Sequence, residues 1–120
     1  MNPNIRACIA YIAGCLVSRQ NASSVYDYVQ SKHILISGTI DESKIEIYDH
    51  DRGCHFSGNK SGNKFSLYHN GDSHFVDFSL NGTKFEGFDY ENSSHYSGEV
   101  NGKTISVYDN GTSSFFNYSI

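Results

Sequence analysis

Hydrophobic and polar residues alternate along most of the chain, in short segments separated by Asn, Asp, Gly and Ser. From Val25 onward the alternation returns every twenty residues, and units begin at Val25, Ile45, Phe65, Phe85 and Ile105. The fourth position of each unit is aromatic and the twelfth is apolar. A fixed period shared by five units indicates a repeat architecture, which has to be interpreted before any single residue.

Each unit contains two turn signals, seen most clearly as Asn70-Gly71 after the first segment and Asn81-Gly82 at the end of the unit. Asn-Gly between alternating segments favours a type I′ hairpin turn. The sequence therefore predicts a mainly β fold, an antiparallel meander of about ten short strands made from five 20-residue hairpin repeats. A β-solenoid with one coil per unit explains the period equally well, but it does not need two reversing turns in every unit.

The first twenty residues predict an α-helix. Asn2 is a suitable cap and Pro3 suits the first helical position. An apolar stripe follows at helical spacing, formed by Ile5, Cys8, Ile9, Ile12, Cys15 and Leu16. We expect one domain over residues 1–120, with an N-terminal helix within 1–20 and a hairpin-repeat sheet over 25–120.

The same segment permits a second interpretation as an export signal. Residues 12–15, IAGC, resemble the cleavage motif of bacterial lipoproteins, which would make Cys15 the lipidated residue of a surface lipoprotein. The apolar run is short and Arg6 is its only basic side chain, so we favour the helix. No stretch is long enough to predict a transmembrane segment.

The period assigns side chains to the two faces of the sheet. The predicted core face collects Ile45, Ile47, Phe56, Phe65, Leu67, Val76, Phe78, Phe85, Tyr96, Ile105, Val107 and Phe116. The opposite face carries an aromatic row, formed by Tyr28, Leu35, Tyr48, His55, Tyr68, Phe75, Phe88, His95, Tyr108 and Phe115. A flat sheet of ten strands is roughly 45 Å wide and the helix only about 24 Å long. We therefore expect the sheet to coil around the helix, even to close as a barrel, unless a second copy covers the rest.

The sharpest chemical candidates lie at the fifth and tenth positions of the units, on the inner face beside the turns. Neighbouring strands place Cys54 near His69 and His74 near Asp89. A thiol beside an imidazole is a nucleophile–base pair, so Cys54, His69, His74 and Asp89 are the catalytic candidates. His69, His74 and Asp89 are also candidate metal ligands. We favour the simpler interpretation that these residues form a solvated rim with ordinary turn chemistry.

The aromatic row is the better candidate for binding. Aromatic rings with polar tips suit a protein partner, a second copy of the chain or a carbohydrate. The candidate binding residues are Tyr48, His55, Tyr68, Phe75, Phe88, His95 and Tyr108. Cross-strand aromatic packing that only stiffens the sheet is the alternative. We also expect the free edges of the coiled sheet, near Val25 and Phe116, to favour self-association.

Charge and cysteine content narrow the function further. Nine basic and thirteen acidic residues give a net charge of −4, without the basic surface that nucleic-acid binding requires. Three cysteines do not form a disulfide framework, so we expect reduced thiols and favour a cytoplasmic location. No cofactor is implied.

Two short segments resemble known hairpin repeats. HYSGEVNGK at 95–103 is similar to the hairpin phrase of MORN repeats, and YDNGTS at 108–113 resembles the start of YD repeats. Both resemblances imply a hairpin array and carry over no site. The sequence as a whole predicts a non-enzymatic binding or self-assembly module. A small enzyme or metal-binding protein, and a lipoprotein anchored at Cys15, are the alternatives.

Overall fold

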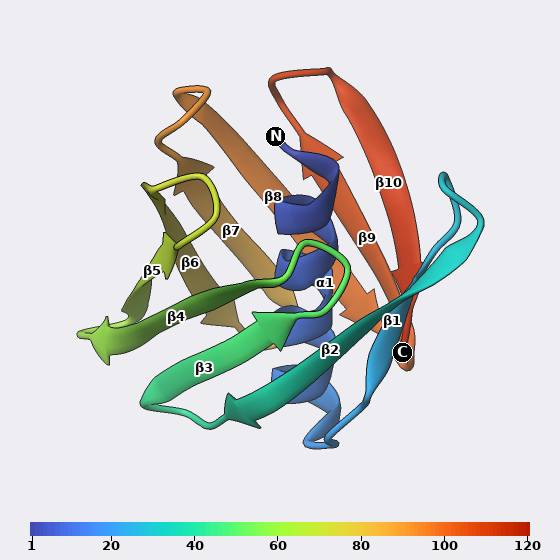
Figure 1. Cartoon of the computed structure of the whole chain (residues 1–120), viewed down its shortest axis with the longest axis horizontal. Coiled ribbons are helices and arrows are strands. Elements are labelled where there is room, and N and C mark those ends of the chain that lie inside the picture. Colours follow the sequence, from blue (N-terminus) through green and yellow to red (C-terminus); the bar gives the residue numbers. More distant parts are fainter.

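The computed structural model describes residues 1–120 and shows one helix enclosed by an antiparallel meander (Figure 1). The elements are α1 (Pro3–Ser18), β1 (Ser24–Asp27), β2 (Lys32–Ile40), β3 (Lys44–Asp49), β4 (Cys54–Ser61), β5 (Lys64–His69), β6 (His74–Asn81), β7 (Lys84–Asp89), β8 (Ser94–Asn101), β9 (Thr104–Asp109) and β10 (Ser114–Ser119). The predicted meander is confirmed. The alternative solenoid is wrong, because consecutive strands pair antiparallel.

The sheet closes on itself, since β1 pairs with β10 through Tyr26 opposite Ser119 and Asp27 opposite Tyr118. The free edges expected near Val25 and Phe116 therefore do not exist, and closure removes edge pairing as a route to self-association. No helix of the chain has the length and hydrophobicity needed to cross a membrane.

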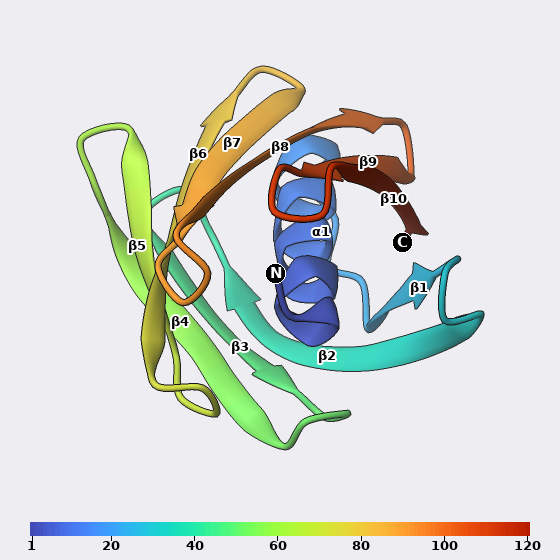
Figure 2. The same ribbon diagram turned by 90° about the horizontal axis from the view of Figure 1, so that it is seen from above.

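The helix occupies the interior of the barrel (Figure 2). Asn2 caps it as expected, accepting a hydrogen bond from the backbone N–H of Asn4 at 2.9 Å. Every residue from Ile5 to Cys15 is buried, so the expected single apolar stripe is too narrow a description. A helix that is apolar on all sides has to be surrounded. Strands on nearly every side of α1 provide that enclosure.

The two halves of the barrel fill their interiors differently. The helix packs mainly against β1, β2 and β3 and against β8, β9 and β10, where most inward side chains are Ile and Val. In Figure 2, strands β4 to β7 stand away from α1. Large aromatic side chains fill that half, in a series that runs from Phe65 through Phe78 and Phe85 to Tyr96, with ring centroids 5.8–6.5 Å apart.

The twenty-residue period is regular only from β3 onward. The last residue of each loop after an odd-numbered strand has a positive φ, and Ser31 and Gly53 are 22 residues apart whereas Gly53 and Ser73 are 20 apart. The first strand is therefore shifted by two residues, and β2, the longest strand, absorbs the difference. As a result, Tyr26 and His33 take the places expected for Tyr28 and Leu35.

The turns also differ from the predicted type. At Gly62, Gly82 and Gly102 the loop has two residues and only its first, the glycine, has a positive φ of 65–68°. This pattern is that of a type II′ turn rather than type I′, because the preceding Ser or Asn still belongs to the strand. In the other hairpins four residues separate the last paired residues, as between Ile40 and Ile45, although Lys44 is already part of β3. Both lengths preserve the pairing parity, so most predicted face assignments hold.

Large and small residues alternate across the inner face. Between β4 and β5 the small residue comes first, since Gly58 opposes Leu67. Between β6 and β7 the large residue comes first, since Phe78 opposes Gly87. A Cβ atom at Gly87 would overlap the Asp77 carbonyl oxygen and the Tyr96 side chain. The glycine is thus required by the size of its neighbours, and Phe78 adds to the aromatic half of the core.

Candidate functional site

Four residues at the fifth position of their units, together with Asp27, which the two-residue shift of the first strand brings to the equivalent place, form a buried ring around the N-terminal end of α1. The five residues are Asp27, Asp49, His69, Asp89 and Asp109. Each aspartate accepts hydrogen bonds from its own four-residue loop, as Asp49 Oδ1 does from the backbone N–H groups of Asp51 and Arg52 at 2.9 and 3.2 Å. The turn chemistry is as expected, but the ring is buried rather than solvated.

The carboxylates of the ring also hold the helix. The Asp109 carboxylate accepts a hydrogen bond from the Met1 amine at 3.0 Å and another from the Arg6 guanidinium at 3.5 Å. Arg6 donates a further hydrogen bond to the Tyr118 hydroxyl and lies over the ring of Phe116. Negative charge near a helix N-terminus is favourable, and these contacts offset the cost of burying the carboxylates.

His69 replaces the aspartate at one position of the ring. Its Nδ1 accepts the backbone N–H of Asp72 at 3.1 Å, so the ring proton is on Nε2. That nitrogen faces Cys54 Sγ at 3.4 Å. Burial lowers the pKa of His69 below its ordinary value. The predicted neighbours Cys54 and His69 are therefore in contact, but the lone pair a general base needs is bonded to the loop.

The Cys54 thiol is not activated. Burial is the largest cause that raises its pKa above the ordinary value, and the nearby Asp49 carboxylate adds to the shift. A nucleophilic cysteine requires the opposite shift, toward the thiolate. The enzyme hypothesis therefore receives no support from this pair.

His74 lies among several carboxylates. The sequence predicted Asp89 as its neighbour but did not predict the others. Its Nε2 is 3.1 Å from Asp89 Oδ1 and its Nδ1 is 3.0 Å from Glu91 Oε2. Asp72 approaches the same imidazole and is paired with Arg52 at 2.7 Å. Neither Asp72 nor Glu91 was among the candidates predicted from the sequence. The sequence signal for Glu91 was its position two residues after Asp89, the predicted neighbour of His74. We call Asp72, His74, Asp89 and Glu91 the rim cluster.

The outer aromatic residues form separate pairs rather than one row. Tyr48 contacts His55, Tyr68 contacts Phe75, Phe88 contacts His95 and Tyr108 contacts Phe115, with ring centroids 4.7–5.0 Å apart. The register shifts each pair by two residues relative to the next pair. On its other side, Tyr68 therefore lies opposite Ser57 rather than an aromatic residue, and Phe88 lies opposite Asp77. The pairs therefore account for cross-strand packing around the whole barrel.

Several parts of the outer surface are hollowed, and two of the depressions adjoin each other. Two adjoining depressions of about 480 and 500 Å³ lie over β5 to β8 and share Lys64 and Asp77. Asp77 is nearly buried there, and it accepts hydrogen bonds from Lys64 Nζ at 3.2 Å and from the Tyr90 hydroxyl at 2.8 Å. The bond to Asp77 raises the pKa of Tyr90.

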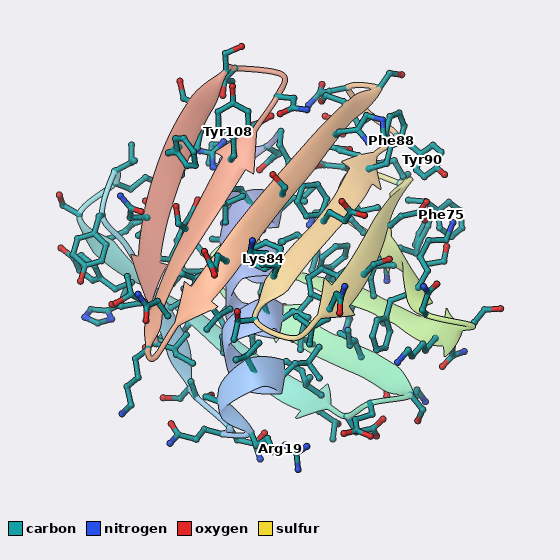
Figure 3. The ribbon with its side chains drawn as sticks, turned by 180° about the vertical axis from the view of Figure 1, so that it is seen from behind. Arg19, Phe75, Lys84, Phe88, Tyr90 and Tyr108 are labelled. Atoms are coloured by element: carbon teal, nitrogen blue, oxygen red, sulfur yellow. The ribbon has the colours of Figure 1, made fainter.

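Aromatic side chains border this hollow, which we call the outer groove. Figure 3 shows Phe75, Phe88 and Tyr90 together on this side of the barrel. Phe88 and Tyr90 meet edge to face with centroids 4.8 Å apart, and His95 lines the same hollow. Of the predicted binding residues, the structure thus brings Phe75, Phe88 and His95 to one groove. It leaves Tyr48, His55, Tyr68 and Tyr108 outside the lining of the two depressions.

Comparisons with known protein families, with curated proteins and with solved structures found no match.

Proposed function

We propose that this protein is a non-enzymatic binding module that holds a hydroxyl-rich ligand, a short saccharide chain, in the outer groove. The observation that carries the proposal is the nearly buried Asp77, held by Lys64 and Tyr90 beneath aromatic side chains. A buried carboxylate on the outside of a barrel is costly unless it has partners. Here those partners also line a hollow.

The groove offers both kinds of contact that a saccharide uses. Phe75, Phe88 and Tyr90 provide aromatic surface for the C–H faces of a sugar ring. Asp77 accepts hydrogen bonds, Lys64 donates them, and Ser79 and Ser97 can do both. A few polar groups set among aromatic walls are typical of small-ligand sites.

The charged floor favours this ligand over a protein partner. The fully buried centre of a protein interface is depleted in charged groups, whereas Lys64 and Asp77 lie at the centre of the groove. The alternative of a lipoprotein anchored at Cys15 has no such support, because Cys15 is buried and the residues before it fill the barrel.

Titration with maltohexaose, cellohexaose and chitohexaose, followed by two-dimensional NMR of the amide groups, tests the proposal. We expect one of the three to shift amides around Lys64, Asp77 and Tyr90. Phe75→Ala should weaken binding about tenfold, a loss of roughly 1.4 kcal/mol. Phe115→Ala is the matched control, because Phe115 occupies the equivalent position of β10 outside the two depressions.

Two results would contradict the proposal. Absence of groove shifts with all three oligosaccharides would remove the saccharide class. Concentration-dependent dimerisation in sedimentation velocity, abolished by Phe75→Ala, would assign the groove to self-assembly instead.

A further inference from the structure

We propose that the rim cluster is a binding site for a divalent transition-metal ion, with Asp72, His74 and Glu91 as ligands and Asp89 as the group that orients the imidazole. The site lies where the loop between β5 and β6 meets the loop between β7 and β8. The site adjoins the outer groove, because His74 also lines the second depression. Its three ligands do not take part in the Lys64–Asp77–Tyr90 contacts, so metal binding can be tested separately from saccharide binding.

The geometry brings three ligand atoms together. Asp72, His74 and Glu91 each offer one atom, and these atoms lie within 4.8 Å of one another. Ligand atoms around a tetrahedral ion with bonds of about 2.1 Å are roughly 3.4 Å apart. Small side-chain rotations are therefore enough to close the site, because Asp72 and Glu91 are carried by loops.

The imidazole has no hydrogen-bond partner although it is nine-tenths buried. Both nitrogens of His74 have carboxylate oxygens at 3.0 and 3.1 Å, yet neither contact has hydrogen-bond geometry. Asp89 Oδ2 is also buried without a partner. Buried polar atoms without partners are rare in folded proteins and call for an explanation, and an absent ion is one of the usual ones.

Charge points the same way. Asp72, Asp89 and Glu91 bring three carboxylates to one imidazole, and Arg52 is the one basic side chain that forms an ion pair with any of them besides His74. The three carboxylates and Arg52 together leave two negative charges, which one divalent cation would neutralise. Asn2 adds only a neutral amide, which donates to Asp72 Oδ2 at 3.3 Å.

The fold does not require these residues. The loop between β9 and β10 has the same length and the same positive φ at its last residue, 55° at Ser113 against 54° at Ser73. At the positions of Asp72 and His74 it carries Thr112 and Ser114, and at the position of Glu91 it carries Gly111. The same loop length and the same positive φ with different side chains indicate that the rim cluster serves a purpose other than folding.

The ligand types select the class of ion. One imidazole nitrogen with two carboxylate oxygens suits Zn²⁺, Co²⁺ or Mn²⁺, whereas Ca²⁺ and Mg²⁺ prefer oxygen alone. Asp89 beside the other nitrogen is the carboxylate–histidine arrangement that orients metal-bound imidazoles. His69, expected from sequence to be a ligand, is not one, because its Nδ1 is bonded to the loop and its Nε2 faces Cys54.

The test is calorimetric titration of the metal-free full chain with Zn²⁺, Mn²⁺ and Ca²⁺. We expect one Zn²⁺ or Mn²⁺ per chain and at least tenfold weaker Ca²⁺ binding. His74→Ser and Glu91→Gln should each weaken Zn²⁺ binding at least tenfold. Asp51→Asn is the matched control, because Asp51 holds the equivalent position to Glu91 in another loop and contacts Asn4 and Lys32 instead.

Co²⁺ absorption separates this site from its nearest competitor, the Cys54–His69 pair. A thiolate ligand gives an intense near-ultraviolet charge-transfer band that nitrogen and oxygen ligands lack, so we expect none, and Cys54→Ser should bind Co²⁺ as the native chain does. The proposal is overturned if that band appears and Cys54→Ser abolishes it. It is equally overturned if no ion binds, or if His74→Ser leaves binding unchanged.

Discussion

The hairpins β5–β6 and β9–β10 have loops of the same length, with the same positive φ at the last residue, and carry different side chains. Both have a four-residue loop that ends in a serine with positive φ, and both begin their loop from a buried residue that accepts a backbone N–H. The residues from 69 to 74 are HNGDSH, whereas those from 109 to 114 are DNGTSS. Each hairpin is thus a control for the other.

The comparison separates what the fold needs from what it tolerates. Both loops need an acceptor at their start, which is an imidazole in one and a carboxylate in the other. Asp109 also neutralises the Met1 amine and Arg6, a role that His69 does not have. Asp72 and His74 have no counterpart in the second hairpin, which is why they stand out as functional candidates.

The largest expected effect comes from Asp109→Ala. It removes the loop acceptor and leaves two buried cations, the Met1 amine and Arg6, without a carboxylate partner. We therefore expect a loss of about 3–5 kcal/mol in the free energy of unfolding. His69→Ala removes only a loop acceptor and should cost about 1–2 kcal/mol. Urea denaturation of both variants measures the difference. Equal losses would contradict the distinct role of Asp109.

The second strands of the two hairpins differ at one buried position, where β10 has Tyr118 and β6 has Phe78. Because only the tyrosine can lose a proton, the free energy of unfolding should depend on alkaline pH through β10 and not through β6 at this position. Burial raises the pKa of Tyr118 to about 12. In the unfolded chain a tyrosine loses its proton near pH 10, so between pH 10 and 12 the folded state holds the extra proton and stability falls as pH rises. This group accounts for about 2–3 kcal/mol of that loss.

Tyr118→Phe copies the other hairpin and tests this assignment. The variant loses the hydrogen bond from Arg6 and should be about 1 kcal/mol less stable at neutral pH. Its stability should then fall less steeply than that of the native chain between pH 10 and 12. Parallel pH profiles from urea denaturation would show that Tyr118 is not responsible.

A smaller effect is expected at Cys54. Burial raises its pKa, so Cys54 stays a thiol near neutral pH, and alkylation by iodoacetamide should accelerate only at a higher pH than for an ordinary exposed cysteine. His69→Asp, which copies the other hairpin, replaces an N–H facing the sulfur by a carboxylate and should slow the reaction further. Mass spectrometry of the labelled peptide gives the rate, and a faster reaction would contradict the assigned proton position on His69.

The sequence was sufficient for most of the architecture. The period and its parity predicted the meander and the buried positions, and they brought Cys54 to His69 and His74 to Asp89. The two-residue shift at Tyr26 was not predicted, because barrel closure depends on the register between the first and last strands. Complete enclosure of the helix was missed as well, since Arg6 inside it is acceptable only with Asp109 and Tyr118 as partners.

The functional candidates were less predictable than the fold. Pairing register determines which strand residues are neighbours, but it does not determine where loop side chains point. Glu91 reaches His74 from a different loop, and Tyr90 folds over Asp77 on the outer face. Both contacts join residues that the twenty-residue period treats as unrelated.

The free energy of unfolding of the metal-free double variant Asp72→Thr/His74→Ser tests the central claim most directly. The variant gives β5–β6 the loop residues of β9–β10. It removes the part-exposed ion pair of Asp72 with Arg52, the hydrogen bond from Asn2 to Asp72, and an imidazole without hydrogen bonds. We predict a stability within about 1 kcal/mol of the native chain. A loss of about 3 kcal/mol or more would contradict the account, because it would make the rim cluster part of the fold.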